Sequence, residues 1–418
     1  MNKRERIILA ILAGLNFTHI LDFMIMMPLG NYLMPAFGIS TEMFSFLVSA
    51  YSLTAFVSGI GAAMVIDRFD RKKVLVISYI GFLLGTAACG FANGYWLLFA
   101  SRVMAGLFGG IIGAQVLAIV SDLFSYERRG RAMGAVMSAF AVASIAGVPI
   151  SLSLTNSFDD NWHMPFLLIA GVGLLLTPLL IRWLPSMKGH VRPAGQRRQL
   201  LLAPFSMLGT AAARNALIFS CVLMMGHFLI IPFINPFLEF NLGFSRDLTP
   251  LIYAVGGIAS LVAALYLGYI SDKKGKLPVF SFSVFFSLFM VLLITKMPVL
   301  PFYIVLIFFA FWFVFATGRA VTAQALISEV VPSEQRGSFM SFNGSVQQLG
   351  SGIASVAAGL IVYKDKTGRI QHFDWLGYAS IVVLVISLLM GRYLFRGFDQ
   401  STMAMDTASV GSEENGNY

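Results

Sequence analysis

The sequence predicts an all-α integral membrane protein with twelve transmembrane helices, arranged as two six-helix repeats. Three observations lead to this fold class. The 418 residues are 57% hydrophobic and only 12% charged, whereas a typical soluble domain is about 25% charged. Long apolar segments recur along the chain, each long enough for a helix to cross a hydrocarbon core of about 30 Å. Short charged motifs also recur, about 205 residues apart.

Gly, Pro, Asn and charged residues separate the apolar segments. The predicted spans are 7–34, 44–66, 74–93, 96–124, 132–154, 164–184, 215–240, 249–270, 277–295, 301–329, 338–362 and 375–395. A polar segment rich in Pro and Arg follows the sixth span and predicts a boundary between two halves. The expected divisions are an N-terminal bundle (1–184), a cytoplasmic linker (185–213), a C-terminal bundle (214–398) and a disordered cytoplasmic tail (399–418).

Lysine and arginine predict the orientation of the spans. Most of them lie at the amino terminus, in alternate loops, in the middle linker and after the last span. Because such residues concentrate in cytoplasmic loops, both termini are expected in the cytoplasm of a cell with this protein in its inner membrane. The same bias accounts for the net charge of +9 without a nucleic-acid partner. The two cysteines are far apart, and no metal-ligand spacing is found.

The two halves repeat one another in sequence. The motif Asp67-Arg68-Phe69-Asp70-Arg71-Lys72 follows the second span, and Asp272-Lys273-Lys274-Gly275-Lys276 follows the eighth. Likewise, Ser121-Asp122 ends the fourth span and Ser328-Glu329 ends the tenth. Several matches at nearly one offset predict an internal duplication. Six-helix repeats with a site between them are a transporter architecture.

These residues resemble the major facilitator superfamily over residues 5–398, and within it the drug–proton antiporter branch with the arabinose-efflux-like permeases. The family's loop motif Gly-x-x-x-Asp-Arg-x-Gly-Arg-Lys starts here at Ala63, and Asp70 replaces its second glycine. The second copy keeps both glycines. The span-4 motif resembles the family's buried arginine followed by glycines, and the span-5 motif resembles its antiporter sequence. The residues of these motifs are Arg102, Gly106, Gly109, Gly110 and Gly113 in span 4, and Gly147 and Pro149 in span 5.

The resemblance implies a monomer that transports a small molecule by alternating access. It also implies a gating role for the charged loops. The residues concerned are Asp67, Arg68, Arg71, Asp122, Gly268, Asp272 and Gly275, with Asp122 expected to pair with Arg71. A charge cluster at a helix end can also be only a topology signal.

The first span carries polar residues in its interior. Asn16, His19 and Asp22 are spaced three apart and form one stripe of a helix. Counted along their helices, Asp22 and Arg102 lie at similar depths, about 8–9 Å below the outer edge of the core. A buried arginine would hold the carboxylate ionised. Our hypothesis is that Asp22 exchanges a proton and Arg102 tunes the exchange. The alternative is a static pair that fixes helix packing.

The second half also carries polar groups within its spans. His227 lies at the position equivalent to Asp22, so it is a candidate second proton carrier, although a lone histidine in a helix is more often a packing residue. Arg319 lies among aromatic residues, which suits an anionic, polyol or aromatic substrate, unless it only pairs helices. The residues expected to line a substrate cavity are Asn16, His19, Gln115, Asn235, Trp312, Arg319 and Gln324.

Together these features predict a proton-coupled secondary transporter that exports a small organic molecule such as a drug, sugar or metabolite. The expected partners are the lipid bilayer, the substrate and protons, with no cofactor and no metal. A proton-independent facilitator or importer on the same fold stays open, as does a ligand sensor that does not transport. An enzyme is the least favoured class, because nothing resembles a nucleophile with its base.

Overall fold

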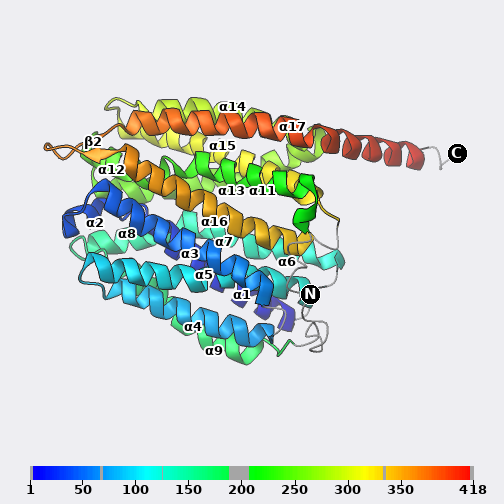
Figure 1. The fold of residues 1–418 in the computed structure, drawn as a ribbon, viewed down its shortest axis with the longest axis horizontal. Coiled ribbons are helices and arrows are strands. Elements are labelled where there is room, and N and C mark those ends of the chain that lie inside the picture. The colour runs from blue at the N-terminus through cyan, green and yellow to red at the C-terminus, as the bar shows by residue number, and fades with distance from the viewer. Residues whose placement is uncertain (1–2, 66–68, 125, 188–206, 333–335, 415–418) are drawn as a thin grey trace.

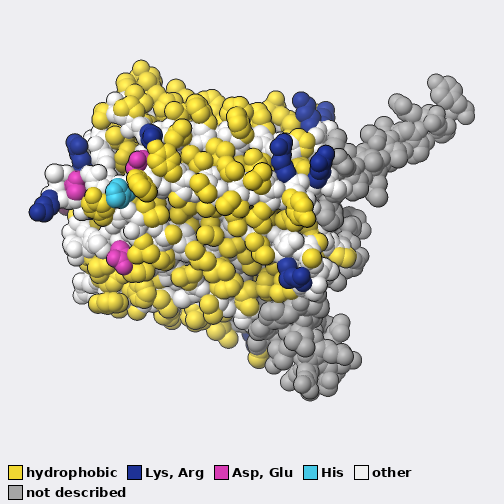
Figure 2. All heavy atoms as spheres, turned by 45° about the horizontal axis from the view of Figure 1, so that its top comes forward, with side chains coloured by type: hydrophobic (Ala, Val, Ile, Leu, Met, Phe, Trp, Pro, Cys, Tyr) yellow, Lys and Arg dark blue, Asp and Glu magenta, His cyan; other side chains and the backbone are white. Residues whose placement is uncertain are grey.

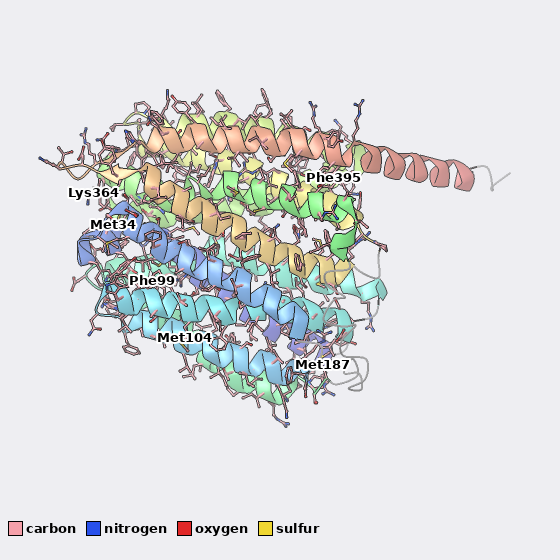
Figure 3. All side chains as sticks on the ribbon, viewed as in Figure 1. Met34, Phe99, Met104, Met187, Lys364 and Phe395 are labelled. Atoms are coloured by element: carbon pink, nitrogen blue, oxygen red, sulfur yellow. The ribbon has the colours of Figure 1, made fainter. Side chains whose placement is uncertain are left out.

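The computed structural model describes residues 3–65, 69–124, 126–187, 207–332 and 336–414, which form long helices lying side by side and one short hairpin. The first and last helices begin and end toward the same end of the bundle (Figure 1). We call that end the terminal face; it includes Lys3 and Asp70. The opposite end, with the hairpin, is called the hairpin face. In Figure 3, Met34 and Lys364 lie toward the hairpin face, and Met187 and Phe395 lie toward the terminal face.

The first half contains six membrane-length segments, two of them broken. Its elements are α1 (Lys3–Ile25), α2 (Gly30–Phe37), α3 (Thr41–Val65), α4 (Arg71–Gly90), α5 (Tyr95–Leu123), α6 (Tyr126–Met137), α7 (Ala139–Val142), the π-helix η2 (Ala143–Gly147), α8 (Val148–Ser157) and α9 (Met164–Trp183). Pro149 has no N–H to bond the carbonyl four residues earlier, which accounts for the adjacent π-helix.

The second half repeats this pattern. Its elements are the 3-10 turn η4 (Met207–Gly209), α11 (Ala211–Phe228), α12 (Ile231–Phe240), the 3-10 turn η5 (Arg246–Leu248), α13 (Thr249–Lys274), α14 (Lys276–Thr295), α15 (Phe302–Glu329), α16 (Arg336–Ile361), β1 (Tyr363–Lys364), β2 (Ile370–Gln371) and α17 (Phe373–Glu414). The break between α11 and α12 precedes Pro232, in the first turn of α12. The strands pair antiparallel, with Tyr363 opposite Gln371.

The all-α architecture with twelve spanning segments agrees with the sequence prediction. Among the described residues, eleven segments are long and apolar enough to cross a membrane. The twelfth is α16, which is 26 residues long but rich in Ser, Gly, Asn and Gln. It packs against α3 and α11 inside the bundle, so its polar residues meet other helices rather than lipid.

The two ends of the C-terminal half differ from the predicted bounds. The second bundle begins at Ala211, three residues before the predicted start at 214. The segment after Asp399 was expected to be a disordered tail, but α17 continues as a helix through Glu414. Helix-forming Met and Ala residues in this segment are compatible with the continuation, and no Pro interrupts it.

Two groups of helices account for much of the contact between the halves. In one group α3 packs against α16, and in the other α13 packs against α8 and η2. Both contacts use close backbone approach. A Cβ atom added at Gly257 would lie 2.8 Å from the backbone nitrogen of Ile145, and one added at Gly359 would lie 3.0 Å from the carbonyl oxygen of Thr41. Larger residues at either glycine would therefore separate the halves.

The surface is that of a membrane protein. Figure 2 shows a broad band of hydrophobic side chains around the middle of the visible face, with charged side chains at its two ends. Large apolar side chains such as Leu175, Leu265 and Phe285 are exposed in the middle of spanning helices. This band is matched to the hydrocarbon core of a bilayer.

Candidate transport sites and family relationship

Asp22 and Arg102 form a fully buried ion pair. Asp22 lies on α1 and Arg102 on α5, and both side chains are 0% exposed. The Nη1 atom of Arg102 donates to Oδ2 of Asp22 at 2.7 Å and to its carbonyl oxygen at 3.3 Å. Thr86 of α4 donates to the other carboxylate oxygen at 3.1 Å. The two residues that the sequence predicted at similar depths are thus in direct contact.

Aromatic rings surround this pair. The guanidinium carbon of Arg102 lies 4.7 Å from the ring centroid of Tyr51 and 6.0 Å from that of Phe166. The Nε and Nη2 atoms of Arg102 and the hydroxyl of Tyr51 are buried without a hydrogen-bond partner among the described residues. All these groups come from the first half. The pair is thus enclosed within one bundle, and the Nε and Nη2 atoms of Arg102 are available as hydrogen-bond donors.

The other polar residues of α1 also point into the first bundle. Asn16 donates to the carbonyl of Val136 at 3.0 Å. The imidazole of His19 lies between the rings of Tyr51 and Phe82, at centroid distances of 6.1 and 6.2 Å. Neither forms a hydrogen bond to a described residue of the second half. The predicted stripe therefore packs helices of one bundle, and its role in lining a cavity stays a prediction.

Gln115 lies on α5 and is fully buried. Neither of its amide atoms has a hydrogen-bond partner among the described residues. This leaves a donor and an acceptor available inside the first bundle. Its predicted role in a substrate cavity stays a prediction.

A second buried cluster lies in the C-terminal half. Arg319 of α15 is 2% exposed, and its Nη2 atom lies 2.7 Å from Nδ1 of His227 on α11. The His227 ring stacks on Trp312, with centroids 5.3 Å apart and planes at 28°. The structure thus brings together three residues that the sequence singled out separately.

Gln324 belongs to a separate group of polar side chains, more than one helical turn along α15 from Arg319. Its side-chain oxygen accepts from Gln347 at 3.3 Å and from Asn343 at 3.5 Å. Gln347 also donates to the hydroxyl of Ser220 at 3.2 Å. This amide network joins α11, α15 and α16 within the second bundle.

The hydrogen bonds between described residues of the two halves lie at the hairpin face. Arg246 of η5 donates to Asp160 at 2.6 Å and to the carbonyl of Asn31 at 3.3 Å, both in the first half. It also donates to Glu239 of its own half at 2.8 Å. The guanidinium lies 4.8 Å from the ring centroid of Tyr32. Arg246 therefore joins the two halves at this face.

Further hydrogen bonds reinforce this closure. Asn31 donates to the carbonyl of Asn235 at 3.2 Å, and Thr41 donates to the carbonyl of Val362 at 2.7 Å. Asn156 donates to Asp247 at 2.9 Å. Asn235, expected in a cavity, thus lies in the contact that closes the hairpin face. Its amide nitrogen bonds the hydroxyl of Tyr253.

The charged loops at the terminal face form equivalent ion pairs in the two repeats. Arg71 pairs with Asp122 at 2.6 Å, as expected. The second copy pairs Lys276 with Glu329, at the equivalent positions of the repeat. Both pairs join the start of the third helix of a half to the end of the fourth. The duplication inferred from the sequence is thus visible as a repeated contact.

The motif glycines have different environments. Gly275 has a φ of +91°, which favours glycine, and it precedes α14. The equivalent Asp70 instead caps α4 by accepting from the amide of Lys72, and it also accepts from Ser186. At this point the first repeat therefore has a side-chain cap from Asp70, where the second has the positive-φ backbone conformation of Gly275.

Two other predicted gating residues, Gly268 and Asp272, gain no support from contacts. A Cβ atom at Gly268 would meet nothing within 4 Å, so it is not a close-packing glycine. Asp272 is exposed. Asp67 and Arg68 lie outside the described residues. In the span-5 motif, a Cβ atom at Gly147 would lie 2.9 Å from a methyl of Leu21 on α1, so this glycine does allow close packing.

Sequence reasoning missed the hairpin-face contacts and the groups around the buried pair. Arg246 belongs to none of the motifs found in the sequence. Tyr51 and Thr86 stood out in no motif, because an aromatic or hydroxyl side chain is common in a membrane helix. The only available signal was the grouping of Arg246 with Asp247 directly before the eighth span.

Comparison with known proteins agrees with this architecture. The family model of the Major Facilitator Superfamily matches residues 12–224 and 216–403. The chain is 22% identical over 385 residues to the uncharacterized MFS-type transporter YceJ of Bacillus subtilis, covering 91% of this chain and 95% of that protein. It is 20% identical over 370 residues to a probable sugar efflux transporter of Helicobacter pylori, covering 86% and 88%.

Solved structures show the same fold. A bacterial homolog of the human lysosomal transporter Spinster, in an inward-facing and unoccupied conformation, superposes with a TM-score of 0.75 at 13% identity, over 95% of this chain and 98% of that chain. A D-xylose-proton symporter superposes with a TM-score of 0.74 at 17% identity, over 93% and 96%. With the family model matching both halves, the chain is a member of the major facilitator superfamily of membrane transporters.

Proposed function

We propose that this transporter exports a small organic molecule from the cytoplasm in exchange for protons, by alternating access of its two halves. The terminal face would lie in the cytoplasm and the hairpin face outside the inner membrane. The similarity to probable sugar efflux transporters of Helicobacter pylori supports export.

The observation that carries proton coupling is the carboxylate of Asp22. It is the one acidic residue among the described spans whose side chain is fully buried, and it lies in the last turn of α1. Ionisable groups at such depth are costly and usually functional. Its ionised form fits the Arg102 guanidinium at 2.7 Å, and protonation would remove that counter-charge.

Protonation of Asp22 would have a mechanical consequence. Arg102 would then be an uncompensated cation beside Tyr51, with only its bond to the Asp22 carbonyl kept. A buried unpaired charge costs several kcal/mol, so the helices around it would favour another arrangement. The proton would thereby bias the first bundle between two conformations, which is the requirement for coupling to transport.

The test is proton movement in inside-out membrane vesicles with an imposed pH gradient. A panel of drugs, sugars and metabolites is added, and the gradient is followed with a pH-sensitive dye. We expect at least one compound to dissipate the gradient with the wild-type protein and not with Asp22→Asn. The matched control is Asp159→Asn, which makes the same change in an exposed loop whose left-handed φ of 55° suits asparagine.

Two outcomes would oppose the proposal. Equal dissipation by wild type and Asp22→Asn would remove Asp22 from the coupling. Substrate movement that needs no pH gradient would favour the facilitator interpretation, in which the Asp22–Arg102 pair only holds helices together.

A further inference from the structure

The charge of Arg319 is not balanced by any carboxylate among the described residues. The other deeply buried arginine, Arg102, has the carboxylate of Asp22. Arg319 is 2% exposed, and no carboxylate of a described residue lies within ion-pair distance of it. Its Nη2 atom contacts only the neutral acceptor Nδ1 of His227, and its Nη1 atom is buried without a partner.

The chemistry of arginine and histidine shows that this contact leaves the charge of Arg319 uncompensated. A guanidinium stays protonated in proteins and only donates hydrogen bonds. The close His227 Nδ1 atom must therefore be an acceptor, so this imidazole is neutral and adds no negative charge. Leaving a buried cation without a counter-charge is strongly unfavourable. An anion bound at Arg319 would supply this counter-charge.

A second unpartnered donor belongs to a residue that also contacts His227. Trp312 precedes Arg319 by seven residues on α15, which puts the two on one face of the helix. The indole Nε1 atom of Trp312 is also buried without an acceptor among the described residues. Its ring stacks on His227. The cluster thus offers two unsatisfied N–H donors beside a platform of aromatic rings.

The cluster borders the contact between the halves. His227 is half-buried, and its neighbour Phe228 meets the ring of Phe23 from the first half at a centroid distance of 5.7 Å. Arg319 itself is enclosed while the hairpin face is closed. An anion would therefore reach it in a conformation in which the halves lie farther apart, as alternating access requires.

We propose that Arg319 and Trp312, beside the aromatic ring of His227, bind the carboxylate of an aromatic organic anion, which is the class of substrate. This inference rests on the proposed transport function and names its substrate. A neutral polyol could accept from the free donors but would leave the charge of Arg319 unbalanced. A neutral aromatic compound without an acceptor would neither accept from the free donors nor balance the charge. The carboxylate supplies the counter-charge, and its ring can stack where Trp312 and His227 already stack.

The experiment measures ligand binding to the purified full-length protein in lipid nanodiscs, by calorimetry and by thermal stability. The probes are benzoate, indole-3-acetate and 1-naphthoate, each compared with its neutral amide, and chloride and inorganic phosphate as inorganic anions. The variants are Arg319→Gln, which removes the charge, and Arg319→Lys, which keeps it. Arg392→Gln removes the same charge from an exposed position near the end of the last span.

We expect at least one carboxylate to bind the wild type and its amide to bind at least tenfold more weakly. Loss of a charge-assisted hydrogen bond should weaken binding about 10- to 100-fold in Arg319→Gln. Arg319→Lys should keep part of the affinity, and Arg392→Gln should bind like the wild type. Removing an unbalanced cation should also leave the ligand-free Arg319→Gln protein at least as heat-stable as the wild type.

The proposal is overturned if none of the carboxylates binds, if amides bind as well as carboxylates, or if chloride or phosphate alone gives the same stabilisation. It is also overturned if Arg319→Gln folds and binds normally. Asp22-dependent proton exchange with a neutral compound would keep the proposed function and reject this substrate class. Carboxylate binding and uptake without proton movement would keep this substrate class and reject proton-coupled export.

Discussion

Removal of the Arg246 side chain should open the hairpin face. Three of its contacts cross between the halves: Asp160 at 2.6 Å, the Asn31 carbonyl at 3.3 Å and the ring of Tyr32 at 4.8 Å. The bond to Glu239 stays within one half and is present whichever face is open. Only the three crossing contacts therefore bias the equilibrium between conformations.

The size of this bias follows from the exposure of each contact. Asp160 is 50% exposed, so its ion pair with Arg246 is screened and contributes about 0.5 kcal/mol. The contact with Tyr32 contributes about 0.5–1 kcal/mol, and the bond to the Asn31 carbonyl about 1 kcal/mol. The total of about 2 kcal/mol predicts that Arg246→Gln lowers the closed-to-open ratio about 30-fold.

The assay is the distance between two spin labels across the hairpin face, measured by double electron–electron resonance. Labels at Ala36 and Lys366, both exposed and in different halves, report the separation in a background with the native cysteines replaced. Arg246→Gln should add a longer-distance population. Arg369→Gln removes the same charge from the hairpin and should not. An unchanged distribution in Arg246→Gln, or an equal change in both variants, would refute the reasoning.

Three further predictions concern packing, charge and pH. Gly110→Ala should lower the melting temperature, because its Cβ would lie 2.2 Å from the carbonyl of a neighbouring helix, whereas Gly113→Ala meets nothing closer than 3.9 Å and should be tolerated. In a double-mutant cycle of the half-buried pair, Lys276→Met and Glu329→Gln should show a coupling of about 0.5–1 kcal/mol, and strict additivity would contradict their contact. Hydrogen bonds from the Thr367 and Gln371 side chains lower the pKa of Asp365 to about 2, below the ordinary value of an aspartate. A lowered pKa adds stability at higher pH, so hydrogen exchange should show the hairpin loosening as the pH falls from about 4 to about 2, and Asp365→Asn should remove this dependence.

The fold was accessible from the sequence because the membrane imposes simple rules. Every backbone polar group must be satisfied inside the bilayer, so apolar length predicts helices. The repeat was readable from short motifs, and the structure repeats their ion pair as Arg71–Asp122 and Lys276–Glu329. The breaks next to Pro149 and Pro232 follow from the missing proline N–H groups.

The side-chain partners were only partly accessible. Depth along a helix placed Asp22 beside Arg102, because rise per residue is fixed. The neighbour that the polar stripe of a helix faces is set by packing against other helices, which the sequence does not give. Asn16 and His19 face their own bundle. The same limit hid the pairing of Arg319 with His227, which are 92 residues apart and have no equivalent pair in the first half.

The central claim is that substrate leaves the cytoplasm in exchange for protons through Asp22. Its most direct test uses proteoliposomes with purified protein and the compound that gives the largest Asp22-dependent signal in vesicles. A pH gradient is set against a substrate gradient, and the gradient at which net substrate flux reverses is measured. Antiport predicts that the reversal point shifts with the pH gradient in wild type and not in Asp22→Asn. A reversal point set by the substrate gradient alone, at every pH gradient, would contradict the claim.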